Sequence, residues 1–323
     1  MPASVAGAEG RARGATGPYA VLRELDDEAS GIPVPERRFI GRSADGDRTV
    51  LIGVPLPGAD AGRFLAEAET SRYLLGPWSA PAAEVAAPGD APWHARPYVP
   101  VLPLPAALSV HGGPLPERTV RALGAALVET LVIGHGQGLA HAGVSPAAVL
   151  LAADGPRLMC FGAVRAAAED GTARSGLPGL ESGSLPPEQA AGGRPQPAGD
   201  VYALGAVLAY AATGYTVPER DELPAALRAV VTACLSRDPA ARPRPAELLD
   251  ALCPAAGPPP PDTGAAAEPP RPATLPDAAA NPAGRAAALL GPGWLPGRII
   301  AALARQSAEL LAATLPVPHA PQD

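Results

Sequence analysis

Side chains of reactive types are few and far apart in this chain. His141 opens the stretch "HAGVSPAAVLLAADGPRLMCFG", and Cys160 lies near its end. A histidine can act as a general base and a cysteine thiolate as a redox switch, but such sites are built with a carboxylate, a cation or a second ligand nearby. The residues next to His141 include no carboxylate or cysteine. We therefore expect His141 to brace its loop as a hydrogen-bond donor and Cys160 to pack as a small buried hydrophobe.

The cysteine and lysine content narrows the chemistry further. Cys160, Cys234 and Cys253 form an odd, scattered set without C-x-x-C spacing. This argues against a disulfide framework or a zinc site and predicts a reducing, cytoplasmic location. Lysine is absent, because all 25 basic residues are arginine. A site whose chemistry needs a lysine therefore cannot obtain one from any neighbouring strand of this chain.

Composition and charge exclude several partners. The 323 residues are 47% hydrophobic, with 36 glycines and 43 prolines, which indicates a folded core whose elements are often interrupted. The formal net charge is −7, and no basic run offers a footprint for nucleic acid or an anionic membrane. No uncharged apolar run reaches the roughly 18 residues of a membrane span, and the N-terminus shows no export signal. We expect neither a nucleic-acid partner nor a membrane span.

The order of the predicted elements is strands first and helices later. Short apolar runs separated by turn residues predict antiparallel strands before residue 55. Helical spacing follows at 61–76, where the apolar side continues to Leu75, and helical signals dominate after residue 116. The stretch 200–214 is apolar nearly all round, which is typical of a helix buried in the centre of a lobe.

Composition shifts divide the chain into five segments. We expect a disordered tail, an α+β domain, a Pro/Ala-rich linker, an amphipathic helix and a second tail at residues 1–18, 19–253, 254–293, 294–315 and 316–323. The predicted apolar face of the amphipathic helix consists of Ile299, Ile300, Leu303, Leu310 and Leu311. This helix packs on the larger lobe or binds a partner, and the sequence leaves both open.

Five motifs stand in a specific order along residues 19–253. They are "HAGVSPAAVLL", "CFG", "PPEQA", "GDVYALGAVLAYAATG" and "CLSRDPAARPRPAELL", and a connector "RPYVPVLPLP" precedes them. In this order the chain resembles the serine/threonine protein kinases, especially their bacterial and actinobacterial members. The resemblance implies an α+β, bilobal protein-kinase-like fold with a small β-rich lobe and a larger helical lobe.

The positions that carry reactive and metal-binding side chains in that family hold other residues here. Phosphoryl transfer uses a strand lysine on the phosphates, a catalytic-loop aspartate, and an asparagine and an aspartate on magnesium. The strand lysine, base aspartate, loop lysine, asparagine and metal aspartate correspond to Gly53, Gly143, Ser145, Ala148 and Cys160. The resemblance therefore implies a domain in which no catalytic residue set is intact.

The expected nucleotide site is also poor in the groups that hold phosphate. Asp26, Asp27 and Glu28 lie where the family has a glycine-rich phosphate loop, and their charge repels a triphosphate. Phosphate binding needs cations or free backbone N–H groups, and magnesium needs oxygen ligands. We expect binding of ATP and magnesium to be absent or weak, while an apolar slot near Tyr98 leaves weak purine binding open.

The residues that the resemblance retains belong to the framework. Glu67 matches the helix glutamate that pairs with the missing lysine, and we interpret it as an exposed helix carboxylate. Asp200 is expected to accept hydrogen bonds from the loop that begins at His141, although helix capping would also explain it. Glu188 and Arg242 match a buried ion pair, and breaking such a pair leaves one charge alone.

We interpret the chain as a pseudokinase, a regulatory or scaffolding module that binds another protein such as a kinase or signalling protein. The alternative is a divergent kinase, or another kinase-fold transferase, with a site rebuilt from other carboxylates. Asp154, Glu169 and Asp170 are candidates, but no motif places them at a magnesium site. A third possibility is a decaying gene whose product merely folds.

Overall fold

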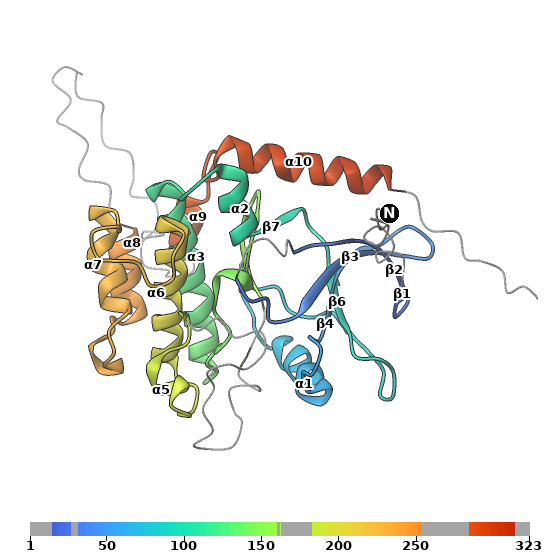
Figure 1. The fold of residues 1–323 in the computed structure, drawn as a ribbon, viewed down its shortest axis with the longest axis horizontal. Helices are drawn as coiled ribbons and strands as arrows, with labels where there is room; N and C mark the ends of the chain where they lie inside the picture. Colours follow the sequence, from blue (N-terminus) through green and yellow to red (C-terminus); the bar gives the residue numbers. More distant parts are fainter. Residues whose placement is uncertain (1–14, 27–31, 160–161, 163–182, 254–283, 314–323) are drawn as a thin grey trace, which may run out of the picture.

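The chain folds into two lobes. The computed structural model describes residues 15–26, 32–159, 162, 183–253 and 284–313. Figure 1 shows a β-rich lobe, with one helix beside its sheet, next to a lobe built mainly of helices. The α+β, bilobal arrangement predicted from the sequence is confirmed.

The small lobe is built on a six-stranded sheet with the order β1-β2-β3-β4-β6-β5 and antiparallel neighbours. Its elements are β1 (Ala15–Thr16), β2 (Tyr19–Glu24), β3 (Arg37–Ser43), β4 (Thr49–Val54), β5 (Glu84–Val85), β6 (His94–Pro97) and the helix α1 (Ala61–Ser71). Successive strand residues point to opposite faces. Val50 and Ile52 pack with Trp93 on one face, whereas Leu51 packs with Ile40 on the face turned toward the large lobe. Two small apolar clusters therefore cover the two faces of the sheet.

Helix α1 is shorter than predicted. It begins at Ala61 and ends at Ser71, and its N-cap is Asp60, whose carboxylate accepts a hydrogen bond from the Arg63 N–H at 2.8 Å. The prediction extended it to residue 76, but Leu75 is 61% exposed, and Gly76 has a φ of 130° that helices exclude. The turn at this glycine ends the helical segment early.

The large lobe is organised around two long helices, α3 and α6. Its helical elements are α2 (Leu104–His111), α3 (Glu117–Gly136), η2 (Pro146–Ala148), α5 (Pro187–Ala190), α6 (Pro197–Thr213), α7 (Ala225–Cys234), η3 (Pro239–Ala241) and α8 (Pro245–Leu252). Leu123 and Leu127 of α3 and Leu204 of α6 are fully buried, as the nearly all-apolar sequence of α6 predicts. Among the helices that the structure describes, none is both long and apolar enough to cross a membrane.

A three-stranded sheet lies where the two lobes meet. It has the order β7-β8-β9 and consists of β7 (Val101–Pro103), β8 (Val149–Ala152) and β9 (Gly155–Leu158). The two apolar runs of "AVLLAADGPRLMCFG" predict a hairpin with its turn at Asp154 and Gly155. β8 pairs antiparallel with β9 as predicted, but the turn lies one residue earlier, at Ala153 and Asp154. Val101 and Leu150 of this sheet belong to the same buried cluster as Leu51 of the small lobe.

Two boundaries differ from the segments drawn from composition. The predicted tail 1–18 contains β1, which pairs with β2. The predicted linker 254–293 contains α9 (Arg285–Leu289), which packs against α3, while residues 254–283 lie outside the described part. Alanine-rich composition did not distinguish this short docked helix from the rest of the predicted linker.

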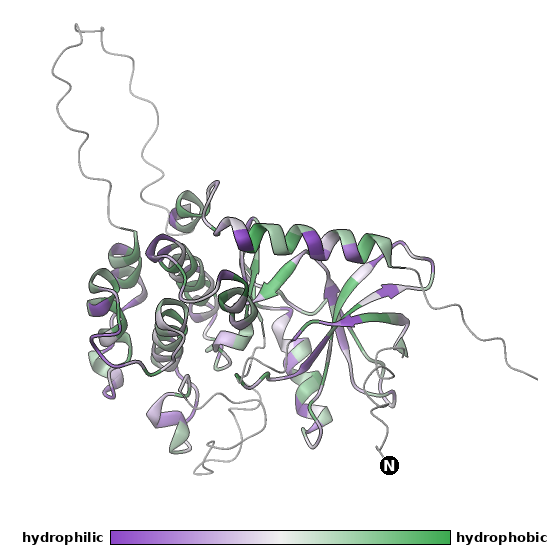
Figure 2. Cartoon of the chain, turned by 45° about the horizontal axis from the view of Figure 1, so that its top comes forward, coloured by the Kyte–Doolittle hydropathy of each residue, from purple (hydrophilic) through white to green (hydrophobic). Residues whose placement is uncertain are grey.

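Helix α10 (Gly297–Ala312) runs from the helical lobe across to the β-rich lobe, as Figures 1 and 2 both show. At its start, Arg298 donates a hydrogen bond to the carbonyl of His111 in α2 at 3.2 Å. Farther along, the Tyr98 hydroxyl donates to Gln306 Oε1 at 2.7 Å, and Arg42 of β3 donates to a carbonyl just past the last turn at 2.9 Å. Of the two roles left open by the sequence, the structure has the helix packed within the chain, on both lobes.

The buried face of α10 differs in part from the predicted one. Its buried residues are Ile299, Ala302, Leu303, Gln306 and Leu310. Ile300 is 39% exposed and Leu311 is 83% exposed. Each follows a buried residue by one position, which turns it by about 100° around the helix axis. Gln306 is buried because Tyr98 supplies a hydrogen-bond partner.

Candidate functional site

The loop that begins at His141 is held by a buried carboxylate of α6. Asp200 accepts hydrogen bonds from the backbone N–H groups of His141 and Ala142, both at 2.7 Å, and contacts His135 Nε2 at 2.8 Å. Ala142 has a φ of 53°, a left-handed conformation that non-glycine residues rarely adopt. The carboxylate stabilises this strained backbone. Asp200 lies inside α6, whose N-cap is Gln196, so helix capping does not explain it.

His141 braces the same loop, and in its contact with Gly143 the ring is the acceptor. Its ring is buried, and Nδ1 accepts a hydrogen bond from the Gly143 N–H at 3.2 Å. The prediction had this ring as a donor. Backbone N–H groups can only donate, so the ring nitrogen must be the acceptor in this contact.

Ser145 and Ala148, two further positions of the loop, have structural roles within it. The Ser145 hydroxyl caps η2 by accepting a hydrogen bond from the Ala148 N–H at 3.3 Å, and Ala148 is fully buried. Cys160 lies outside the described residues. Within the described part of the chain, no group of three or more His, Cys, Asp or Glu side chains is placed to hold a metal ion.

Gly53 of β4 lies against a buried histidine and glutamate. His94 of β6 is its register partner, and His94 Nε2 lies 2.7 Å from Glu36 Oε2. A Cβ atom on Gly53 would stand 2.4 Å from His94 Cε1 and 2.9 Å from Glu36 Oε2. Real Cβ atoms do not approach other atoms so closely. The space into which a side chain at residue 53 would extend is therefore filled by His94 and Glu36.

Arg96 completes this buried polar cluster. Its guanidinium donates to His94 Nδ1 at 3.1 Å and to the carbonyl of Ala80. Because an arginine cannot accept, His94 Nδ1 is the acceptor, and Nε2 carries the proton that is donated to Glu36. Sequence analysis missed Glu36, His94 and Arg96. The available signal was the alternation in "HAR", which places His94 and Arg96 on one face of a strand.

The cluster lowers the pKa of Glu36. Burial by itself raises the pKa of this carboxyl, but the interaction with His94, together with the charges of Arg96 and Arg38, outweighs burial and lowers the pKa to about 2.

Glu36 should therefore contribute to stability in a pH-dependent way. Its folded-state pKa of about 2 lies below its ordinary value of 4.5, so the contribution is complete above about pH 4.5 and is lost as the pH falls toward 2. We expect Glu36→Gln to flatten the fall in melting temperature between pH 5 and pH 3 relative to the unmodified protein. Thermal melts across this range check it, with the exposed Glu69→Gln as control. Parallel acid limbs for Glu36→Gln and the unmodified protein would contradict the assignment.

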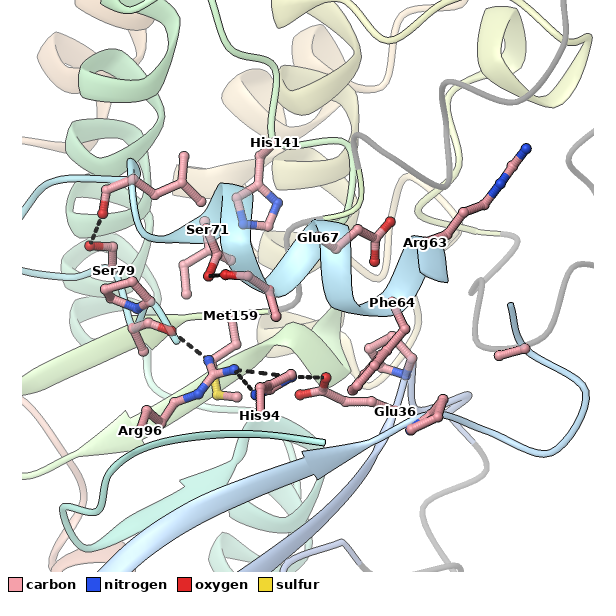
Figure 3. A pocket seen from close by; sticks show the side chains of 18 of the residues that line it. Glu36, Arg63, Phe64, Glu67, Ser71, Ser79, His94, Arg96, His141 and Met159 are labelled. Carbon is pink, nitrogen blue, oxygen red and sulfur yellow. Dashed lines mark hydrogen bonds and ion pairs between the residues drawn. The ribbon is translucent and has the colours of Figure 1, made fainter. Parts of the chain in front are cut away.

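A cavity of about 320 Å³ is lined by residues of both α1 and this cluster. Figure 3 shows Glu67 and Phe64 on α1, with His94, Arg96 and Glu36 across from the helix. Phe64 stacks on the His94 ring, with centroids 5.1 Å apart. Glu67 is only 7% exposed, so its interpretation as an exposed carboxylate is wrong. The helical spacing located its face of α1, but not the sheet that covers that face.

Arg38 of β3 joins the two lobes. It pairs in register with Gly53, and its side chain is fully buried. The guanidinium donates to both carboxylate oxygens of Asp26, with Nε at 2.8 Å, and Nη1 donates to the carbonyl of Ala147 in η2 at 2.7 Å. Only about 10 Å³ of space remains between these groups and Pro103 of the connecting strand. Ligand sites usually measure about 300 Å³ or more, and about 10 to 15 Å³ is needed for a single water.

Beside the connector, a second cavity of about 300 Å³ remains. Its walls include Leu51, Tyr98, Val101 and Leu150, and Arg96 borders both this cavity and the one under α1. The Tyr98 hydroxyl is turned to Gln306 of α10, and burial raises its pKa to about 12. Space of the size of a small apolar ligand therefore exists near Tyr98.

An ion pair fastens the segment around α5 to the rest of the large lobe. Arg242 donates to both carboxylate oxygens of Glu188, at 2.6 and 2.8 Å, and also to the carbonyls of Ser236 and Ala198, each at 2.9 Å. The Arg242 side chain is 1% exposed, but that of Glu188 is 26% exposed, so only the arginine is fully buried. Burial raises the pKa of Glu188, but the hydrogen bonds from Arg242 outweigh this and lower it.

Comparisons with known proteins agree with this architecture. No family model matches the chain. It is 35% identical to a probable serine/threonine-protein kinase, PkwA of Thermomonospora curvata, over 74% of this chain and 34% of that protein. It is 31% identical to the serine/threonine-protein kinase AfsK of Streptomyces coelicolor, over 74% of this chain and 32% of that protein. The kinase domain of PknI from Mycobacterium tuberculosis superposes with a TM-score of 0.57 at 22% identity, over 75% of this chain and 96% of that domain. The chain carries a protein-kinase-like domain.

The chain spans about a third of the length of the curated relatives it matches. Within the kinase-like domain, the structure brings Glu67, His94 and the loop at His141 to one cavity. Glu188 and Arg242 lie elsewhere, beside α5. Gly53, the position of the strand lysine in the resemblance, lies beside the cavity wall that His94 and Glu36 form.

Proposed function

We propose that this kinase-like domain does not transfer phosphate and acts as a regulatory or scaffolding module, a pseudokinase. The observation that carries the proposal is the filling of the lysine position. A lysine at Gly53 could not extend toward Glu67, because the His94 ring and the Glu36 carboxylate stand in its path. The family's reaction depends on that cation and on groups that Gly143 and Ala148 do not supply.

The cleft is closed around Arg38 but keeps a cavity near Tyr98, and the closure around Arg38 supports the same proposal. Asp26, Arg38 and Ala147 link the lobes at the place where the resemblance expects nucleotide phosphates. Leu51 and Leu150, from the two lobes, meet in one buried apolar cluster. A triphosphate would have to displace the protein's own charged and apolar contacts. ATP and magnesium binding is therefore proposed to be absent or weak.

Helix α10 supports a fixed rather than an opening domain. It contacts α2 in the large lobe and β3 in the small lobe, and Glu309 forms an ion pair with Arg23 of β2 at 3.1 Å. Catalytic cycles commonly require lids or lobes to open and close. A helix bonded to both lobes restrains such movement, which suits a scaffold.

We propose a protein as the partner, such as a kinase or another signalling protein in the cytoplasm. The relatives in the comparison are named as serine/threonine-protein kinases. The structure contains Cys234 and Cys253 as free thiols, which suits a reducing compartment. The net charge of −7 gives no reason to propose nucleic acid.

A transferase with a rebuilt site is the second candidate, and one observation favours it. Arg38 of β3 is the register partner of Gly53, so a cation lies next to the position that holds the lysine in the family. Asp154 is bonded to Arg157 on the surface and is not in the cleft. Glu169 and Asp170 lie outside the described residues. Arg38 is engaged by Asp26 on both oxygens, which is why we place this candidate second.

Nucleotide binding separates the two candidates. We expect no phosphate transfer from radiolabelled ATP to the protein or to generic substrates above a heat-denatured control, and no magnesium-dependent rise in melting temperature up to millimolar ATP. A ligand at 100 times its dissociation constant would add about 2.7 kcal/mol, which is plain in a melt. Gly53→Lys should also stay inactive, because its Cβ would collide with His94.

The arginine provides the control. If the rival is correct, label incorporation and a metal-dependent thermal shift should both be present in the unmodified protein and be lost in Arg38→Gln. That pair of results would overturn the proposal and assign the function to a rebuilt active site.

A further inference from the structure

Arg38 is a buried cation whose position depends on an anion from the same chain. Its side chain is 0% exposed, whereas the Asp26 side chain that pairs with it is 14% exposed. A buried guanidinium is tolerated when it is paired and fully hydrogen-bonded. Asp26 supplies two acceptors and the Ala147 carbonyl a third. The planar fork of arginine matches two oxygens of a carboxylate or a phosphate group equally well.

The small space beside Arg38 is lined mainly by apolar residues, so its positive charge comes from Arg38. Among the described residues that line this small space, Arg38 is the only cation and Asp26 the only anion. The other walls are Ile32, Val34, Pro103, Pro105, Ala106 and Ala147. Glu36 also acts on Arg38 electrostatically, but its carboxylate is bonded to His94. Removal of the Asp26 carboxylate would therefore leave a positive, mostly apolar recess.

We propose that Arg38 forms an oxyanion site in the cleft and that Asp26 is its internal ligand. The site takes a carboxylate or phosphate group in the two-oxygen geometry that Asp26 now occupies. The Asp26 side chain is partly exposed, whereas that of Arg38 is not. A carboxylate or phosphate group from solvent would therefore reach the guanidinium by replacing the Asp26 carboxylate. The internal carboxylate thus orients Arg38, whose guanidinium reaches from β3 to the Ala147 carbonyl and closes the cleft at this point.

This inference deepens the proposed function, since it names what keeps the cleft closed. The two proposals are tested by different experiments. Phosphate transfer tests whether the domain is noncatalytic, whereas oxyanion binding by Asp26 variants without metal tests whether Asp26 is an internal ligand. The oxyanion experiment can fail while the domain is still noncatalytic.

The test compares Asp26→Ala with the unmodified protein in the full chain. Melting temperatures are measured in sodium chloride and in sodium pyrophosphate or sodium acetate at equal ionic strength, without magnesium. We expect Asp26→Ala to melt lower in chloride and to gain about 3 °C or more, saturably, with at least one of the two oxyanions. The unmodified protein should show no saturable gain. A response to both salts identifies a general oxyanion site, and a response to pyrophosphate alone identifies a phosphate site.

Control variants test whether a response to oxyanions depends on Arg38. Asp154→Ala removes an acidic partner of Arg157 and should respond to neither salt, because the Asp154 carboxylate is 72% exposed and water takes its place without a bound anion. Asp26→Asn keeps the shape of the side chain, so it replaces Asp26→Ala if the smaller variant does not fold. The proposal is overturned if the Asp26 variants show no saturable gain, or if the unmodified protein gains as much as they do. It is also overturned if adding Arg38→Gln to a responding variant leaves the response intact.

Discussion

Arg242→Ala is expected to lower the free energy of unfolding by about 3–5 kcal/mol, because it leaves Glu188 without its partner in a partly buried site. The change also removes the donors to the Ser236 and Ala198 carbonyls and the contact of the guanidinium with the Tyr202 ring. Urea denaturation followed by circular dichroism measures the loss.

A neighbouring arginine provides a matched control. Arg244 also pairs with a glutamate, Glu247, at 2.7 Å, but both side chains are exposed, at 83% and 50%. Exposed pairs contribute about 0–1 kcal/mol, so Arg244→Ala should change little. The double variant Arg242→Ala/Glu188→Ala should be more stable than the sum of the two single losses predicts, because no unpaired charge remains. Equal small losses for Arg242→Ala and Arg244→Ala would contradict the role of the ion pair.

Trp294→Ala is expected to cost about 3–5 kcal/mol, the usual range when a large buried aromatic side chain is removed. Trp294 is 2% exposed, lies in the main apolar cluster of the large lobe, and donates from its ring N–H to the Ala153 carbonyl at 2.8 Å. It stands just before α10, so its loss should release that helix first. Hydrogen exchange should then be faster in α10 than in α6.

The outer side of α10 offers the comparison for this variant. Leu311 is a large apolar residue on the same helix, but it is 83% exposed. Leu311→Ala should leave the unfolding free energy within about 0.5 kcal/mol of the original. If α10 exchanges no faster in Trp294→Ala than in Leu311→Ala, Trp294 does not anchor the helix.

The sequence by itself determined the order of the elements and the framework of the large lobe. Apolar spacing located the strands before residue 55, the buried helix α6 and the hairpin β8–β9, because these depend on local periodicity. Motif order singled out Asp200, Glu188 and Arg242 as framework residues. The structure places Asp200 on the loop backbone and Arg242 on Glu188. Such contacts recur wherever the same motifs stand in the same fold.

Only the tertiary structure decided what fills the cleft. His94 meets Gly53 through the pairing of β4 with β6, and Arg38 meets Ala147 across 109 residues of chain. Spacing within one strand gives the face of a side chain but not the strand that lies beside it. The burial of Glu67 and the path of α10 over both lobes were missed for the same reason. A helical pattern shows which side is apolar, whereas the surface that covers this side is set by packing between segments far apart in the chain.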